Sequence, residues 1–465
     1  MSHNPFVRLG TDIRDELLAR GSWPPGLSGF SWGRTRQIVT DPLPILLDCY
    51  ERFGPIFSVR VFHERFVFML GPAANHYVLV SHASNFRWRD GDFGQLTPLL
   101  GDGLLTIDGD YHRRARRIML PAFHHESIAS AIGTMVSEAE QAIDSFQAGR
   151  RVDIYHWARE LAMRIAMRAL LGLDPDDSES GARAAYHFER ALSFYGTDPL
   201  GRMRRGPGSV WRRMIASRGV LDEIVYTEIR RRRGSEAEQR GDILTLLLAA
   251  CDEDGSGLSE DEIRDQLMTL MFAGHDTSTS TITFLLYELA RHPEALNRVW
   301  AEQDEVLQGR PPDVAALAGG LPQLDMALDE TLRLYPPAWI GPRRAVKEFE
   351  FAGHHVPAGA YVAYCSWASH RLPDVFPDPD AFVPARFSQE RKAALPKGAY
   401  VPFGAGSRTC IGMRFGQLEI KAVASLLLQR FRPELPGGHS LHVRQMPTLS
   451  PDGGLELILR ERRPW

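Results

Sequence analysis

The sequence predicts a mainly α-helical protein with small β-sheets, an α+β fold. Apolar residues recur at helical spacing over most of the chain, for example at 126–146 and 150–172. Strand-like composition, rich in Val, Ile, Phe and Tyr, is concentrated in 56–71, 349–367 and 441–460. The first of these segments encloses a polar His-Glu-Arg turn, which predicts a β-hairpin.

One folding unit is expected over residues 1–465, because no repeat, low-complexity block or long Gly/Ser linker divides the chain. The N-terminal segment 1–23 is charged and broken by proline, so it resembles neither a signal peptide nor a membrane anchor. No uncharged apolar run reaches the roughly 18 residues of a membrane span. The net charge of −4 gives no reason to expect nucleic-acid binding, and four widely spaced cysteines favour a reducing compartment. We therefore expect a soluble, cytoplasmic monomer.

One helix should cross the whole molecule. Ser259 and Glu262 have the spacing of a capping box, and helical periodicity then continues to about Arg291. That is ~32 residues, or ~48 Å. Its middle, AGHDTSTST at 273–281, combines a glycine with small polar residues that compete for backbone hydrogen bonds. This is either a tolerated local weakness or a distortion that lines a functional site, and we favour a distortion at Gly274.

A cysteine in a glycine-rich turn is the strongest chemical signal. In PFGAGSRTCIG (402–412), Cys410 comes just before a segment with helical pattern, where free N–H groups stabilise a thiolate, and Arg408 adds positive charge. Such a thiolate can be a nucleophile, a redox thiol or a metal ligand. No base or second cysteine lies nearby in the sequence, which favours a metal whose other positions a cofactor fills, and haem iron is the clearest case.

The same turn is similar to the haem-binding loop FxxGxRxCxG of the cytochrome P-450 monooxygenases. The resemblance identifies Cys410 as the axial iron ligand of haem b (iron protoporphyrin IX). It also places further residues of the loop against the haem: Phe403, Gly404, Gly406, Arg408 and Gly412.

Other motifs follow in the order of that family, from about Pro24 to about Ile458. AGHDTS (273–278) resembles the oxygen-activation segment, with Ala273 and Gly274 beside an acid–alcohol pair of Asp276 and Thr277. ETLR (330–333) and PARF (384–387) resemble the segments that form a structural network, here Glu330, Arg333 and Arg386.

Cations for the two haem propionates are also implied by the resemblance. His112 and Arg116 form an H-x-x-x-R pattern on one helical face, and Arg343 lies fourteen residues before Pro357. Together with Arg408, these side chains would bind the propionates by charge-assisted hydrogen bonds.

The implied function is hydroxylation or epoxidation of a hydrophobic small molecule, whether fatty acid, terpenoid, steroid or polyketide. O₂ would be the cosubstrate, and two electrons would come ultimately from NAD(P)H through a separate ferredoxin or flavodoxin. A basic face of Arg113, Arg114, Arg117 and Arg414 would suit such an acidic partner. The family's substrate-contacting segments map to apolar residues in this chain: Phe86, Trp88, Phe93, Phe272, Trp339, Ile340 and Leu449.

Three other functions remain open at this point. One is a peroxide-driven haem-thiolate peroxygenase or isomerase, although such relatives usually lack the acid–alcohol pair retained here. Another is a non-enzymatic haem sensor or carrier of hydrophobic ligands. The third is a cysteine-nucleophile hydrolase, which would bind no haem.

Overall fold

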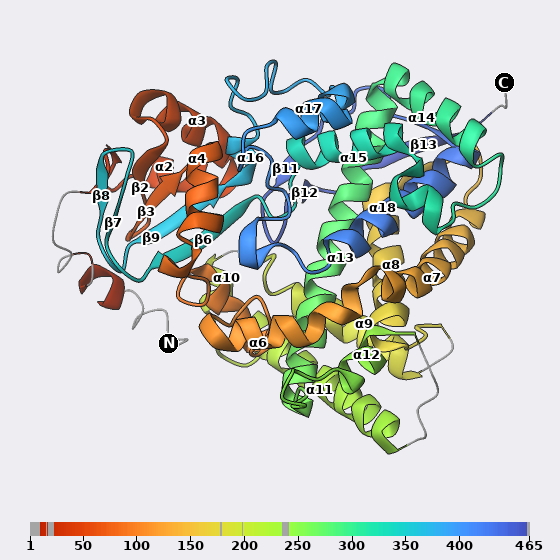
Figure 1. The fold of residues 1–465 in the computed structure, drawn as a ribbon, viewed down its shortest axis with the longest axis horizontal. Helices are drawn as coiled ribbons and strands as arrows, with labels where there is room; N and C mark the ends of the chain where they lie inside the picture. Colours follow the sequence, from red (N-terminus) through yellow and green to blue (C-terminus); the bar gives the residue numbers. More distant parts are fainter. Residues whose placement is uncertain are drawn as a thin grey trace.

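The computed structural model describes residues 10–14, 16, 23–176, 179–197, 199–234 and 241–462. It confirms the mainly helical architecture with small sheets. Figure 1 shows the largest sheet on one side of the molecule and most helices on the other, with α13 running through the helical part. Most of the predicted N-terminal segment 1–23 lies outside the described residues, and the single-domain boundary stays a prediction.

The α-helices are α2 (Trp32–Thr40), α3 (Pro42–Phe53), α4 (Pro72–His76), α5 (Thr97–Leu100), α6 (Gly109–Met119), α7 (His125–Asp144), α8 (Ile154–Ala166), α9 (Glu179–Leu192), α10 (Pro199–Met203), α11 (Val210–Gly234), α12 (Ile243–Ala249), α13 (Glu260–Arg291), α14 (Pro293–Val306), α15 (Pro322–Leu334), α16 (Ser366–Ser369), α17 (Gln389–Ala394) and α18 (Met413–Arg430). Short π-helical segments are η1 (Tyr77–Ser81), η5 (Met167–Leu171) and η6 (Ala316–Gly320).

Within the described residues, the strands form four sheets. The largest has the order β1-β2-β3-β9-β6-β4, with β1 (Gly26–Leu27), β2 (Ile56–Val61), β3 (Glu64–Met69), β4 (Phe86–Arg87), β6 (Ile340–Ala345) and β9 (Tyr361–Cys365). A three-stranded sheet joins β10 (Phe431–Glu434), β13 (Glu456–Glu461) and β5 (Arg151–Asp153). Two hairpin-like pairs are β7 (Phe349–Phe351) with β8 (His354–Val356), and β11 (Val443–Arg444) with β12 (Ser450–Pro451). The predicted hairpin at 56–71 is therefore present as β2 and β3.

The predicted long helix is α13. Its 32 residues begin after the capping box of Ser259 and Glu262, in which both reciprocal hydrogen bonds form. Most of its side chains are buried, because α8, α15 and α18 pack around it. The helix is continuous through Gly274, so the expected distortion at that residue is wrong. The glycine is tolerated there because the packing of the helix, rather than its propensity, holds it together.

The predicted helix at 150–172 begins later than expected. Residues Arg151–Asp153 form β5, which pairs with β13 some 300 positions further along the chain. The side chain of Asp153 then caps α8 by accepting a hydrogen bond from the His156 N–H at 3.1 Å. The α-helix ends at Ala166 and continues as the π-helical η5.

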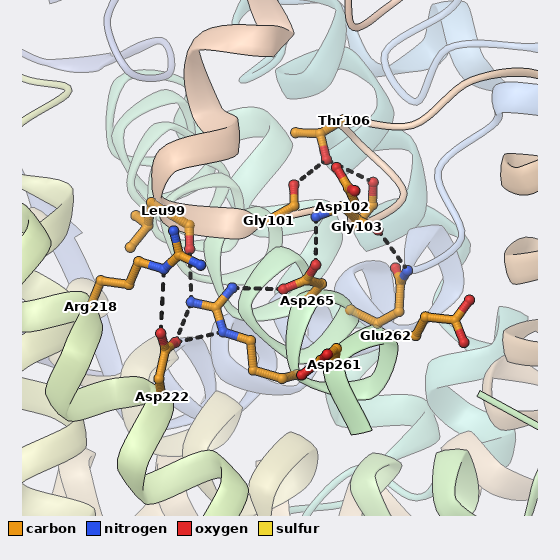
Figure 2. Close-up of polar contacts among 12 residues, drawn as sticks. Leu99, Gly101, Asp102, Gly103, Thr106, Arg218, Asp222, Asp261, Glu262 and Asp265 are labelled. Atoms are coloured by element: carbon orange, nitrogen blue, oxygen red, sulfur yellow. Dashed lines mark hydrogen bonds and ion pairs between the residues drawn. The ribbon is translucent and has the colours of Figure 1, made fainter. Parts of the chain in front are cut away.

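Charged side chains tie the loop after α5 to α13 (Figure 2). Arg264, only 1% exposed, pairs with Asp222 of α11 and with Asp265 of α13, and it donates to the Leu99 carbonyl at 3.1 Å. Asp265 in turn accepts a hydrogen bond from the Asp102 N–H at 2.6 Å. The guanidinium of Arg264 thus joins α5, α11 and α13, and Asp265 links this group to the loop.

In the part of the chain that the structure describes, every helix is too short or too polar to cross a lipid bilayer.

Candidate functional site

The Cys410 turn is shaped by glycines. Gly404 and Gly406 have φ values of +68° and +66°, a region that favours glycine. A Cβ on Gly406 would also collide with the Leu79 carbonyl of η1. The Cys410 N–H donates to the Phe403 carbonyl at 2.9 Å, which closes the turn and leads the chain into α18.

Cys410 keeps accessible surface, although the protein packed around it raises the pKa of its thiol by burial. We infer that this surface faces an internal space. The Gly412 N–H and the charge of Arg116 lower the pKa, but burial outweighs them. The Gly412 N–H thus favours the thiolate, as expected for this turn, although burial raises the pKa of the thiol overall. A bound metal cation would lower that pKa.

Four cationic or basic side chains gather beside this turn. His112 and Arg116 come from α6, Arg343 from β6 and Arg408 from the turn itself. Arg343 is 1% exposed, and its Nη2 has no hydrogen-bond partner among the described residues. Burial, together with Arg408 and Arg116, lowers the pKa of His112 to about 3, which leaves that imidazole neutral at pH 7.

One carboxylate faces these arginines. Asp108 pairs with Arg408 at 2.7 Å and also accepts the Trp88 and Arg89 N–H groups at 3.0 Å each. Burial lowers the pKa of both Arg343 and Arg408 to about 10. Neither Arg116 nor Arg343 has a carboxylate within ion-pair distance in the described chain. Because buried charges need partners, this cluster is suited to an anion carrying about two negative charges.

A group of partly exposed residues also lies along the middle of α13. Phe272, Ala273, Gly274 and Thr277 are partly exposed, whereas the residues around them on this central helix are buried. A Cβ built on Gly274 would meet nothing within 4 Å. Phe272 and Ile411, the neighbour of Cys410, both pack against the same large apolar cluster.

The predicted acid and alcohol have different surroundings. Thr277 donates its hydroxyl proton to the Ala273 carbonyl of its own helix at 2.6 Å, and its oxygen lone pairs remain available as acceptors. Asp276 is 3% exposed, and its Oδ1 pairs with Arg159 of α8. Burial raises the pKa of Asp276, but His275 and Arg159 outweigh it and keep the carboxyl ionised.

The Glu330–Arg333–Arg386 network forms as expected. Arg333 and Glu330 are fully buried and make two contacts, at 2.7 and 2.9 Å, while Arg386 reaches Glu330 at 3.3 Å. Arg333 also donates to three backbone carbonyls: those of His370, Pro379 and Ala381. The network joins α15 to the segment before α18 and thereby supports the cysteine turn.

The predicted substrate-contacting residues separate into groups. Trp339, Ile340 and Leu449 lie together in one apolar cluster, and Ser280 of α13 donates to the Leu449 carbonyl. Phe272 faces Tyr195 of the α9–α10 connection at 6.2 Å between ring centroids.

Two of the predicted pocket aromatics have other contacts. Phe86 is a core residue, 5% exposed, packed edge-on against Phe349 within one apolar cluster, so the structure places it in the core. The guanidinium of Arg343 lies 3.6 Å from the ring centroid of Trp88, and the ring of Phe93 is tilted against Trp88 at 4.7 Å between centroids. Trp88 therefore contacts a cation of the cluster, and its place in the substrate pocket stays a prediction.

The predicted basic face is largely neutralised. Arg113 pairs with Asp110, Arg114 with Glu262 at 3.0 Å, and Arg117 with Asp252 at 2.6 Å. Asp110 lies three residues from Arg113 on α6 and could have been found from the sequence. Glu262 and Asp252 lie more than 130 positions from their arginines, on α13 and in the loop before it, so nothing in the local sequence indicates those pairs.

Sequence reasoning missed three residues around Asp276. Arg159 and Glu189 lie on α8 and α9, and nothing in their local sequence indicates a site. His275 could have been found, because it lies beside the predicted acid within AGHDTS.

The family model for cytochrome P-450 matches residues 24–456. A cyclooctat-9-en-7-ol 5-monooxygenase from Streptomyces melanosporofaciens is 37% identical over 408 residues, covering 86% of this chain and 87% of the relative. A sterol 14alpha-demethylase from Mycolicibacterium vanbaalenii is 31% identical over 409 residues, with coverage of 87% and 89%. The solved structure of a retinoic acid-bound cyanobacterial CYP120A1 has a TM-score of 0.84 at 29% identity, covering 95% of this chain and 100% of that chain.

Proposed function

Because the chain belongs to the cytochrome P-450 family of monooxygenases, we propose that it hydroxylates or epoxidises a hydrophobic small molecule with Cys410 as the haem ligand. The observation that carries this proposal is the accessible surface of Cys410 beside a cluster of cations, in which Arg116 and the buried Arg343 have no carboxylate at ion-pair distance among the described residues. Thiolate-ligated haem, when bound, supplies the cleavage of the O–O bond.

The described residues fit haem. Haem carries two propionate carboxylates. Their two negative charges would balance the excess positive charge of the cation cluster. Arg343 would give its unpaired Nη2 to one of them, and Arg116 and Arg408 would contribute further charge-assisted hydrogen bonds. His112, neutral in this structure, can donate from a ring N–H.

The open face of α13 would hold the substrate and manage protons. Phe272 and Ala273 offer apolar surface, and Gly274 leaves room beside them. Thr277 can accept a hydrogen bond through its oxygen. Asp276 can exchange protons through Oδ2, which has no hydrogen-bond partner in the described part of the chain. Trp339, Ile340 and Leu449 would border the pocket from the large sheet.

A terpenoid is the first substrate class to test. The relative named for oxidation of cyclooctat-9-en-7-ol acts on an apolar cyclic alcohol, and the solved neighbour holds retinoic acid. Titration with cyclic terpenoid alcohols, retinoic acid, sterols and fatty acids should reveal ligands through a change in the haem spectrum. A shift only with fatty acids would contradict the preference for terpenoids.

Electrons from NAD(P)H would arrive through a separate ferredoxin or flavodoxin. The paired arginines of α6 give this partner no net positive surface, so we assign its contact to the side of the Cys410 turn, where Arg414 is exposed. The cytoplasmic location and monomeric state stay predictions.

The carbon monoxide spectrum of the reduced, haem-loaded protein tests the proposal. We expect the long-wavelength Soret band of thiolate ligation, its loss in Cys410→Ala, and its retention in Cys251→Ala, which removes another exposed cysteine. A wild-type protein that binds haem without this band would overturn the assignment of Cys410.

A further inference from the structure

His275 precedes the acid Asp276 on α13 and lies between two carboxylates. The ring is fully buried, with Nε2 at 3.1 Å from Glu189 Oε1 and at 3.0 Å from the Arg159 carbonyl. Its Nδ1 lies 3.3 Å from Asp276 Oδ1. Each ring nitrogen therefore lies within ion-pair distance of a carboxylate, although Nδ1 makes no hydrogen bond among the described residues. Two carboxylates at this distance favour a protonated imidazole.

The charges around the ring favour the same state. Arg159 of α8 contacts both carboxylates, Asp276 through Nη1 and Glu189 through Nη2 at 2.8 Å. Glu419 of α18 is a further titratable group that interacts with His275. With a neutral ring, Arg159, Asp276 and Glu189 would carry a net charge of −1, whereas an imidazolium brings the group to zero.

Burial lowers the pKa of His275, but the contacts with Asp276 and Glu189 outweigh it, so the net direction is upward. The same contacts hold the pKa of Glu189 below its usual value, against the effect of burial.

The two carboxylates differ in exposure. The Glu189 side chain is 40% exposed and the Asp276 side chain 3%, so His275 connects a carboxylate at the surface to one in the interior. Both cations approach the same oxygen of Asp276, Oδ1, whereas Oδ2 is buried without a hydrogen-bond partner in the described chain.

We propose that His275 is the positioning residue for Asp276: held as a cation by Glu189, it binds Oδ1 together with Arg159 and leaves Oδ2 to take up and release protons. This inference rests on the proposed function, in which Asp276 supplies protons to the reaction. Loss of the proton from His275 removes one of the two cations on Oδ1 and increases the affinity of Asp276 for a proton. The protonation state of His275 thereby sets the pH range in which Asp276 can take up and release protons for the reaction.

Histidine NMR of the haem-loaded, carbon monoxide-bound protein tests the charge state without turnover. The resonance lost in His275→Asn identifies the ring. We expect it to remain protonated above the ordinary histidine value of about 6.5, and Glu189→Gln to lower its pKa. Glu160→Gln is the matched control, because Glu160 pairs with an exposed histidine, His156, at 3.3 Å. A His275 that titrates at or below the ordinary value, or that ignores Glu189→Gln, would overturn the proposal.

A second measurement tests the consequence for Asp276. The pH dependence of O₂ reduction, driven by NADPH through a surrogate ferredoxin and its reductase, should shift to higher pH in His275→Asn. A profile that coincides with wild type would show that His275 does not act on proton supply, which also overturns the proposal. The wild-type carbon monoxide spectrum decides the proposed function separately, since neither NMR arm depends on thiolate ligation.

Discussion

Gly404 and Gly406 of the cysteine turn share a backbone conformation but not an environment. Both have positive φ, so alanine at either position would cost about 1 kcal/mol of unfolding free energy for strain alone. At Gly404 the nearest atom to an added Cβ is the Arg408 carbonyl oxygen at 3.7 Å, which is ordinary contact. At Gly406 the added atom would collide with the Leu79 carbonyl, and backbone would have to move.

We therefore expect Gly406→Ala to destabilise the protein by about 1–3 kcal/mol more than Gly404→Ala. Urea unfolding of the two variants measures the difference, with Gly404→Ala as the matched control for φ strain. Equal losses would mean that the turn and η1 do not pack as closely as Gly406 indicates.

Residues were predictable from sequence where a motif fixes them locally. Glu330 and Arg333 are three apart on α15, and their pairing follows from helix geometry. Trp88 was not predictable, because its position under Arg343 depends on β6 approaching from 255 positions away. An aromatic residue has the same sequence signature in a pocket wall, in a core and under a guanidinium.

At the scale of elements, the buried Arg264 of α13 contacts Asp222 of α11 and the Leu99 carbonyl of α5. Its neighbour Asp265 continues these contacts to the Asp102 N–H in the loop after α5 (Figure 2). Arg264→Met would leave Asp222 and Asp265 without their shared cation. Since both carboxylates keep some exposure, we expect a loss of about 2–3 kcal/mol, less than the ~3–5 kcal/mol typical of a fully buried broken pair. Hydrogen exchange at the Asp102 and Leu104 amides should also accelerate.

The matched control for this change is Arg218→Met. Arg218 contacts the same Asp222 at 3.4 Å and donates to the Pro98 carbonyl, but its side chain is 33% exposed. A pair this exposed contributes about 1 kcal/mol or less. Equal losses of unfolding free energy in the two variants would contradict the claim that the buried Arg264 contributes more to stability than the partly exposed Arg218.

Helices and strands were predictable where the residues that determine them lie close together in the sequence. The start of α13 follows from a capping box, whose two partners are three residues apart. Strand β5 was predicted as helix, because its three residues are held by pairing with β13 and carry no periodic pattern of their own. The absence of a distortion at Gly274 likewise reflects helices packed around α13, which a local propensity argument cannot include.

At the scale of the whole molecule, α13 lies between two groups of charged side chains, one in which the charges are paired and one in which a carboxyl has no cation beside it in the part of the chain that the structure describes. On the side of α8 and α9, His275, Arg159, Glu189 and Asp276 balance one another. On the side of α18, Glu419 has no cation at ion-pair distance among the described residues and instead accepts a hydrogen bond from Ser278 at 2.6 Å. An isolated buried carboxyl of this kind makes the stability of the molecule depend on pH.

Glu419→Gln should weaken that dependence. Burial raises the pKa of Glu419 from its ordinary 4.5 to about 7, so the folded protein holds a proton that the unfolded chain releases earlier. The stability contribution is full below about pH 4.5 and is lost as the pH rises through about 7, a change of about 3 kcal/mol. Glutamine stays uncharged and can still accept from Ser278. Urea unfolding at pH 5 and pH 8 should therefore show a smaller difference in the variant than in wild type, whereas equal differences would mean that Glu419 ionises freely between α13 and α18.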